Sequence, residues 1–169
     1  SGTFVGLPEG STFVKGATKF QISYVGGAGH DVVLTVVSPA AAPAALAVDA
    51  AGNGVLEPGE LAILQPTWTN ISGADLHLTG STANFTGPAG AAYFNPDASG
   101  DYGTLADGTS SSCVDCYEVQ ATPVTERPVG HWDATIDEIL NSGSVSQTWT
   151  LHVGESFGDV PTSHPFYAF

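Results

Sequence analysis

Short runs in which apolar and polar residues alternate recur along this chain. The alternation is clearest over residues 131–139 and 148–153. Side chains two residues apart lie on the same face of a β-strand, so each run predicts a strand with one inner face. The residues on these two inner faces are Trp132, Ala134, Ile136 and Glu138, and Trp149, Leu151 and Val153.

The pattern predicts one antiparallel β-sandwich over residues 46–154. Its expected strands are residues 61–70, 76–78, 91–94, 117–121, 131–139 and 148–153, with long polar turns at 95–101 and 106–113. The tryptophans Trp68, Trp132 and Trp149 are expected in the core, because aromatic burial dominates small sandwiches. The alternative for one of them is an aromatic platform for a sugar.

Residues 1–37 predict a separate β-meander. Its expected strands are residues 3–5, 12–14, 18–24 and 31–37, with glycine-containing turns between them. A sheet of this size buries too little surface to be stable alone. We therefore expect it to pack on the main domain, on a preceding module or on another copy of the chain.

An Ala/Pro-rich stretch at residues 38–45 marks the expected domain boundary. Its prolines are expected to prevent regular strand pairing and to favour an extended, semi-rigid linker. The remaining residues, 155–169, form a C-terminal tail.

The charge balance excludes nucleic acid as a partner. Three Lys and Arg residues against seventeen Asp and Glu residues give a net charge of −14. Such a field repels phosphate backbones and anionic membrane surfaces, and it attracts divalent cations. No apolar run reaches the roughly 18 residues of a membrane span. With neither Met nor a signal peptide, the chain is expected to be a processed piece of a longer precursor.

The two cysteines, Cys113 and Cys116, form a C-x-x-C pair. A redox-active C-x-x-C pair is typical of a protein with βαβ patterning, and a zinc module needs a second cysteine pair. The sequence has neither a βαβ pattern nor a second pair. We therefore predict a local disulfide, which is typical of an oxidising, extracellular compartment. So short a loop gains little from cross-linking, so the bond should shape its surroundings more than stabilise the fold.

Residues 49–60, D-A-A-G-N-G-V-L-E-P-G-E, have the layout of an EF-hand-type calcium loop. The expected Ca²⁺ ligands are Asp49, Asn53, the carbonyl oxygen of Val55, Glu57 and Glu60. Ala51 occupies the third position and removes one ligand, so water or another carboxylate would complete the shell. The alternative is a polar turn without metal.

The flanks of this loop are not helical, because Pro58 and Pro66 lie where a second helix would run, and Pro costs about 3 kcal/mol there. The motif D-x-x-G-N-G-x-x-E-P-G-E followed by T-W-T-N resembles the opening of calcium-binding, immunoglobulin-like modules of bacterial surface and secreted proteins. The resemblance implies an all-β fold: an antiparallel immunoglobulin-like sandwich with calcium near one edge.

Both ends of the chain also resemble segments of surface proteins. The first 35 residues or so are similar to the terminal turn of autotransporter passenger repeats. The tail F-G-D-V-P-T-S-H is similar to the start of an S-layer homology motif, without the helices that would bind a cell wall. Residues 26–34 fit one copy of the RTX calcium nonapeptide, or alternatively a glycine-rich hairpin with His30 as a turn residue.

Motifs for catalysis are missing, and no enzyme is expected. The chain has no G-x-S-x-G, H-E-x-x-H or Walker-type loop. The alternation places His131, Asp133 and Asp137 on one face. That face is either a metal site or calcium-completing patch, or the solvated face of an edge strand. Asn70 and Asn84 begin N-glycosylation sequons, a motif too short to carry weight in a chain that looks bacterial.

These observations together predict a non-catalytic structural or adhesive module of a bacterial secreted or cell-surface protein, rigidified by Ca²⁺, with a self-assembling fibre subunit as one form. Expected partners are other copies of the chain or neighbouring surface modules. The alternative is a carbohydrate- or ligand-binding accessory module of a secreted enzyme. Neither nucleic acid binding nor membrane insertion is expected.

Overall fold

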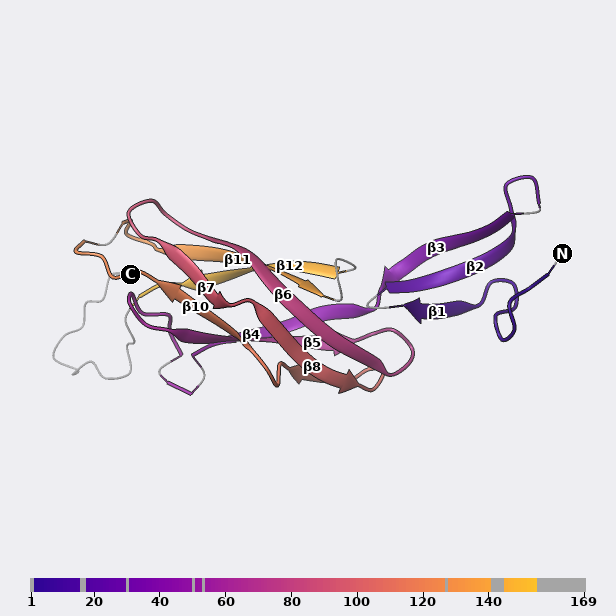
Figure 1. Ribbon diagram of the computed structural model, residues 1–169, viewed down its shortest axis with the longest axis horizontal. Coiled ribbons are helices and arrows are strands. Elements are labelled where there is room, and N and C mark those ends of the chain that lie inside the picture. The colour runs from indigo at the N-terminus through magenta and orange to yellow at the C-terminus, as the bar shows by residue number, and fades with distance from the viewer. Residues whose placement is uncertain are drawn as a thin grey trace.

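The computed structural model describes residues 2–15, 18–29, 31–49, 51–52, 54–126, 128–140 and 145–154. In these residues the protein is all-β, with three antiparallel sheets (Figure 1). Two sheets face each other as a sandwich, and the third extends from one end of it. The prediction of an all-β sandwich is confirmed, whereas its immunoglobulin-like character stays a prediction. No helix that could cross a membrane occurs in the described residues.

The N-terminal sheet is a meander with the strand order β1-β2-β3. Its strands are β1 (Thr12–Lys15), β2 (Thr18–Gly26) and β3 (Asp31–Pro39). Residues 3–5 are not the strand that we predicted, because the turns at Gly6 and Gly10, both with positive φ, fold this segment over Tyr24. The backbone N–H of Phe4 donates to the Tyr24 hydroxyl (2.9 Å), which donates to the carbonyl of Leu7 (2.7 Å).

The sandwich consists of two sheets with different strand orders. The first has the order β4-β5-β10-β7, with β9 also paired to β5, and comprises β4 (Ala41–Val48), β5 (Ala62–Asn70), β7 (Tyr93–Asp97), β9 (Ser110–Ser112) and β10 (Tyr117–Ala121). The second has the order β12-β11-β6-β8 and comprises β6 (Leu76–Thr86), β8 (Ser99–Leu105), β11 (Asp133–Leu140) and β12 (Val145–His152).

The Ala/Pro stretch pairs as a strand, so the prediction that its prolines prevent regular pairing is wrong. Most of it belongs to β4, which runs antiparallel to β5. An edge strand needs donors toward only one neighbour, and the register shifts between Pro43 and Ala45, so the missing N–H is tolerated. Ala40 and Ala41 follow the N-terminal sheet directly and are fully buried in the core of the sandwich. The junction between the two parts is therefore packed against the sandwich.

Strand β9 lies in a stretch that we predicted as a polar turn, residues 106–113, and β8 begins within the other predicted turn, residues 95–101. Serine, glycine and aspartate have low strand propensity, but tertiary packing overrides it here. Tyr102 and Leu105 of β8 point into the core, and β9 continues the pairing of β5 beyond β10. The chain thus gains two strands that local composition does not show.

The disulfide between Cys113 and Cys116 is present, as predicted, and lies in the loop between β9 and β10. Both strands pair with β5, and the interruption between them faces Pro66, which has no N–H to offer. The carbonyl of Asp101 on β8 accepts from the N–H of Val114 in this loop (2.7 Å). The disulfide loop therefore bridges the two sheets along one edge.

All three tryptophans lie in the core, as predicted, and so does the carboxylate of Glu138, which has 0% exposure. Its Oε2 accepts from the indole N–H groups of Trp68 (3.0 Å) and Trp149 (2.7 Å). Its Oε1 accepts from the hydroxyls of Tyr117 (2.7 Å) and Tyr102. These five residues lie on five strands, which belong to both sheets of the sandwich.

The four groups around the Glu138 carboxylate all donate hydrogen bonds to it. Burial raises the pKa of the Tyr102 and Tyr117 hydroxyls, and the neighbouring carboxylate raises it further. Both hydroxyls therefore stay protonated at neutral pH. An indole N–H can only donate, so the carboxylate is the form that accepts from all four groups.

Two glycines make room for this network. A Cβ at Gly80 would lie 2.0 Å from the Tyr117 hydroxyl oxygen, and one at Gly100 would lie 2.6 Å from the Tyr117 ring. No side chain fits at these distances. Gly80 and Gly100 lie on β6 and β8, so the small residues in these strands are a packing requirement.

We expect Glu138→Ala to destabilise the fold by at least about 3 kcal/mol, because it removes the acceptor of four buried donors. Glu138→Gln should cost less, since its oxygen can still serve the two indoles while the tyrosine hydroxyls accept from its amide. Urea denaturation measures both. The control is Glu126→Ala at an exposed position, with an expected change within about 0.5 kcal/mol. Equal midpoints for Glu138→Ala and the control would contradict this role.

Stability should also fall in alkaline solution. Tyrosines of the unfolded chain ionise near pH 10 or so, whereas Tyr102 and Tyr117 keep their protons in the fold because their pKa is raised. The native state then binds more protons than the unfolded state, so stability drops as pH rises, by about 1.4 kcal/mol per pH unit for each tyrosine. Urea midpoints followed above pH 10 or so test this, and Tyr102→Phe should flatten the slope.

Candidate functional site

The predicted calcium loop folds tightly after β4. Asp49 and Gly54 both have positive φ (44° and 82°), and the Asp49 carbonyl accepts from the N–H groups of Gly52 and Gly54. A Cβ at Gly52 would lie 1.9 Å from Oδ2 of Asp49, so the Asp49 carboxylate turns into the loop. The sharp turn that the motif requires at its sixth position is therefore present.

The other expected calcium ligands are only partly placed. Oε2 of Glu60 accepts from the N–H of Glu57 (3.0 Å), so this carboxylate turns back toward the loop backbone. Val55 is half-buried, and Asn53 lies outside the described residues. Within the described part of the chain, the acidic side chains of this loop do not gather into a three-ligand group. Calcium binding here stays a prediction.

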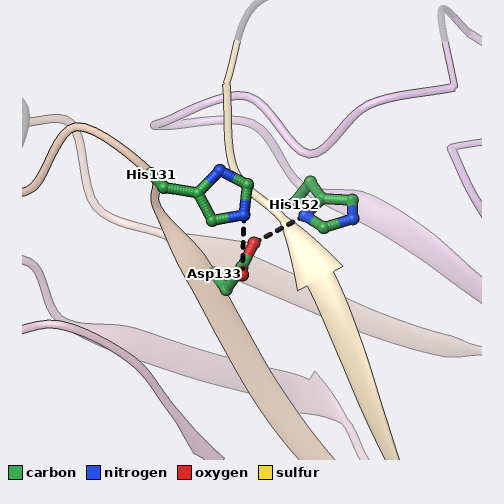
Figure 2. Close-up of side chains that lie close together, drawn as sticks. All are labelled: His131, Asp133 and His152. Carbon is green, nitrogen blue, oxygen red and sulfur yellow. Dashed lines mark hydrogen bonds and ion pairs between the residues drawn. The ribbon is translucent and has the colours of Figure 1, made fainter.

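The structure instead gathers a different set of ligands, namely His131, Asp133 and His152. Asp133 begins β11, and His152 ends β12 directly opposite it in the antiparallel register. His131 lies two residues before Asp133, in the segment that leads into β11. Figure 2 shows the three side chains pointing toward one another from these neighbouring segments.

The carboxylate of Asp133 lies between the two imidazoles. Its Oδ2 is 3.0 Å from Nε2 of His131, and its Oδ1 is 2.5 Å from Nδ1 of His152 (Figure 2). The two imidazole rings lie 5.7 Å apart, centroid to centroid. One ligand atom from each residue lies within 4.8 Å of the others, so the three side chains form a compact N, O, N group.

The alternation in the sequence predicted two members of this group, His131 and Asp133, and not the third, His152. We predicted Asp137 on the same face as His131 and Asp133, but its carboxylate accepts from Asn84 (2.9 Å) and Thr148 (2.6 Å) and is not part of the group. The edge-strand interpretation is also wrong, since β11 lies between β12 and β6. The alternation in residues 148–153 predicts that His152 lies on the outer face of its strand, and this was the one sign in the sequence that it could join the group.

The three-residue group and the predicted calcium loop lie at the same end of the sandwich. Leu56 of the loop pairs with Val153, the residue after His152. A groove of about 500 Å³ lies between this loop, the end of β4 and the end of β12. Its lining residues are Leu46, Ala47, Val48, Gly54, Val55, Leu56, Thr150, Leu151 and His152. Because β4 starts at the N-terminal sheet and ends at this loop, the groove lies at the opposite end of the sandwich from that sheet.

Two further expectations from the sequence meet the structure here. All three tryptophans are buried, so the prediction of a tryptophan sugar platform is wrong. Asn70 is fully buried, and its amide donates to the carbonyls of Ala74 (2.7 Å) and Leu105 (2.8 Å), so the folded protein does not present this sequon. The S-layer-like tail and His30 of the nonapeptide lie outside the described residues.

The chain matches no model of a protein family, and no curated protein sequence is significantly similar to it.

We expect calcium to raise the stability of the protein if residues 49–60 bind it. At a hundred times the dissociation constant the gain is about 2.7 kcal/mol. Asp49→Ala should abolish the difference between calcium and EDTA, whereas Asp75→Ala, at an exposed acid outside the loop, should preserve it. Thermal melting measures both variants, and identical curves for the wild type in calcium and in EDTA would contradict the prediction.

Proposed function

We propose that this chain is a non-catalytic association module of a bacterial extracellular or cell-surface assembly, in which the N-terminal sheet joins one copy to the next. The observation that carries the proposal is the exposure of β3. This edge strand of nine residues presents Val32, Val33, Leu34 and Val36, which are 50%, 39%, 51% and 60% exposed. Apolar edge strands are templates for pairing with another chain.

The register of the sheet gives this edge an apolar face. Leu34 pairs with Ile22 and Val36 with Phe20, so these side chains lie on one face. Phe20 in turn pairs with Phe13 of β1, and their rings lie 5.7 Å apart. On this apolar face, the side chains near β1 are covered, whereas those of β3 are exposed to solvent.

Charge favours a second copy of the chain as the occupant of this edge. Residues 1–40 contain two lysines, Lys15 and Lys19, and two acids, Glu9 and Asp31, so their net charge is zero. The whole net charge of −14 therefore belongs to the rest of the chain. Two N-terminal sheets can meet without charge repulsion, whereas two sandwiches repel each other.

The extracellular part of the proposal has separate support. The Cys113–Cys116 disulfide is typical of proteins from oxidising compartments. The resemblance of residues 49–60 to calcium-binding modules of bacterial surface proteins points the same way. Calcium in that loop would stiffen the far end of the sandwich and leave the N-terminal sheet free to associate.

The proposal predicts that the wild-type protein has at least twice its monomer mass in solution. Leu34→Lys and Val36→Lys should each weaken association by about tenfold or more, because pairing would bring like charges together at an apolar contact. The control is Val114→Lys, the same kind of change at an exposed position on the disulfide loop. Light scattering after size exclusion measures the mass over a range of concentrations.

Two results would overturn this function. A wild-type protein that stays monomeric at the highest concentration does not associate through any surface. Association that Leu34→Lys and Val114→Lys weaken equally does not run through β3. Far-UV circular dichroism of each variant shows whether a change of mass reflects misfolding.

A further inference from the structure

We infer that His131, Asp133 and His152 bind a divalent transition-metal ion of the zinc class. The three residues offer two imidazole nitrogens and one carboxylate oxygen, with each ligand atom within 4.8 Å of the others. Imidazole and carboxylate ligands of this kind suit Zn²⁺, Co²⁺, Ni²⁺ or Cu²⁺. Calcium takes oxygen ligands, so this site is chemically distinct from the calcium loop.

The ligand atoms would shift by up to about 1.5 Å relative to one another to hold an ion. Two ligand atoms of a tetrahedral Zn²⁺ lie about 3.3 Å apart, given metal–ligand distances of about 2.0–2.1 Å. The nitrogen of His131 lies 3.0 Å from the nearer Asp133 oxygen, and that of His152 lies 2.5 Å from the other. To hold the ion, each imidazole would move from its nearer carboxylate oxygen by less than about 1 Å, and the most widely spaced ligand atoms, which lie within 4.8 Å, would close by up to about 1.5 Å.

The backbone holds the group together without the metal. Asp133 and His152 are directly opposite in the β11–β12 ladder, so their separation is fixed by strand pairing. On the inner side of the same ladder, Ala134 pairs with Leu151, and both are buried, which anchors the two strands. Two of the three ligands, Asp133 and His152, thus lie on paired strands, and only His131 lies in the segment that leads into β11.

The surroundings leave the site open to solvent and attract cations. The side chains of His131 and His152 are 71% and 76% exposed, and that of Asp133 is 34% exposed. Three protein ligands leave a fourth position for water or an anion, as in zinc sites that are not closed by protein. The net charge of −14 raises the local concentration of divalent cations.

Another histidine of the chain provides a matched control. His77 lies 3.8 Å from Asp101 through its Nε2, and the two side chains are 57% and 43% exposed. Within the described residues, this pair is not part of a group of three metal-ligating side chains. It tests whether a single exposed His–Asp pair is enough for binding.

The experiment is a titration of the 169-residue chain with Zn²⁺ by isothermal calorimetry in neutral buffer, with Co²⁺ as a spectroscopic probe. We expect one ion per chain, and visible Co²⁺ absorption that is typical of a four-coordinate site. His131→Ala, Asp133→Asn and His152→Ala should each weaken Zn²⁺ binding by at least about tenfold, whereas His77→Ala should leave it unchanged within about twofold.

Three outcomes would overturn the inference. The wild type could bind Zn²⁺ no more tightly than the His131→Ala/His152→Ala double variant. His77→Ala could weaken binding as much as His152→Ala does. Excess Ca²⁺ could displace Zn²⁺ completely, which would indicate an oxygen-ligand site elsewhere. The substituted histidines are exposed, so melting in EDTA should be unchanged, and that measurement separates loss of binding from loss of folding.

Discussion

The buried carboxylate of Glu138 is the constraint on which the sandwich depends. Removing an ion from water costs far more than a folded domain can spare unless polar partners replace the solvent. Here the partners are two indoles and two phenols, which come from both sheets. A slip of one strand by a single residue would turn its donor outward. The network therefore fixes the register of five strands at once.

The other acids of the sandwich lie nearer the surface than Glu138 does. Glu138 is the single charged side chain among the buried residues that the structure describes. The other described acids of the sandwich are exposed or half-buried, and they make this part of the chain strongly anionic. The neutral N-terminal sheet extends from one end of this anionic sandwich. The His131–Asp133–His152 group lies at the opposite end of the sandwich.

The sequence predicted what depends on local periodicity and missed what depends on pairing between distant segments. Alternation identified β11 and β12 and the inward position of Glu138, but not the four donors, which are up to 70 residues away in the chain. Prolines made β4 look like a linker, although an edge strand tolerates them. His152 joins His131 and Asp133 only through the β11–β12 register, which no single segment encodes. The cysteine pair was predictable because its contact is local.

The unequal edges of the N-terminal sheet have a consequence for the symmetry of any assembly. Of its two edges, β1 has four residues and β3 has nine, and Val14 of β1 packs against the sandwich core. Two β3 strands that pair antiparallel are related by a two-fold axis, and such an isologous contact is complete with two copies. Growth into a filament requires a heterologous contact, for which β1 is short and partly covered. If copies of the chain associate through β3, the geometry of this sheet favours a closed pair, and a longer array would use a second surface of the protein.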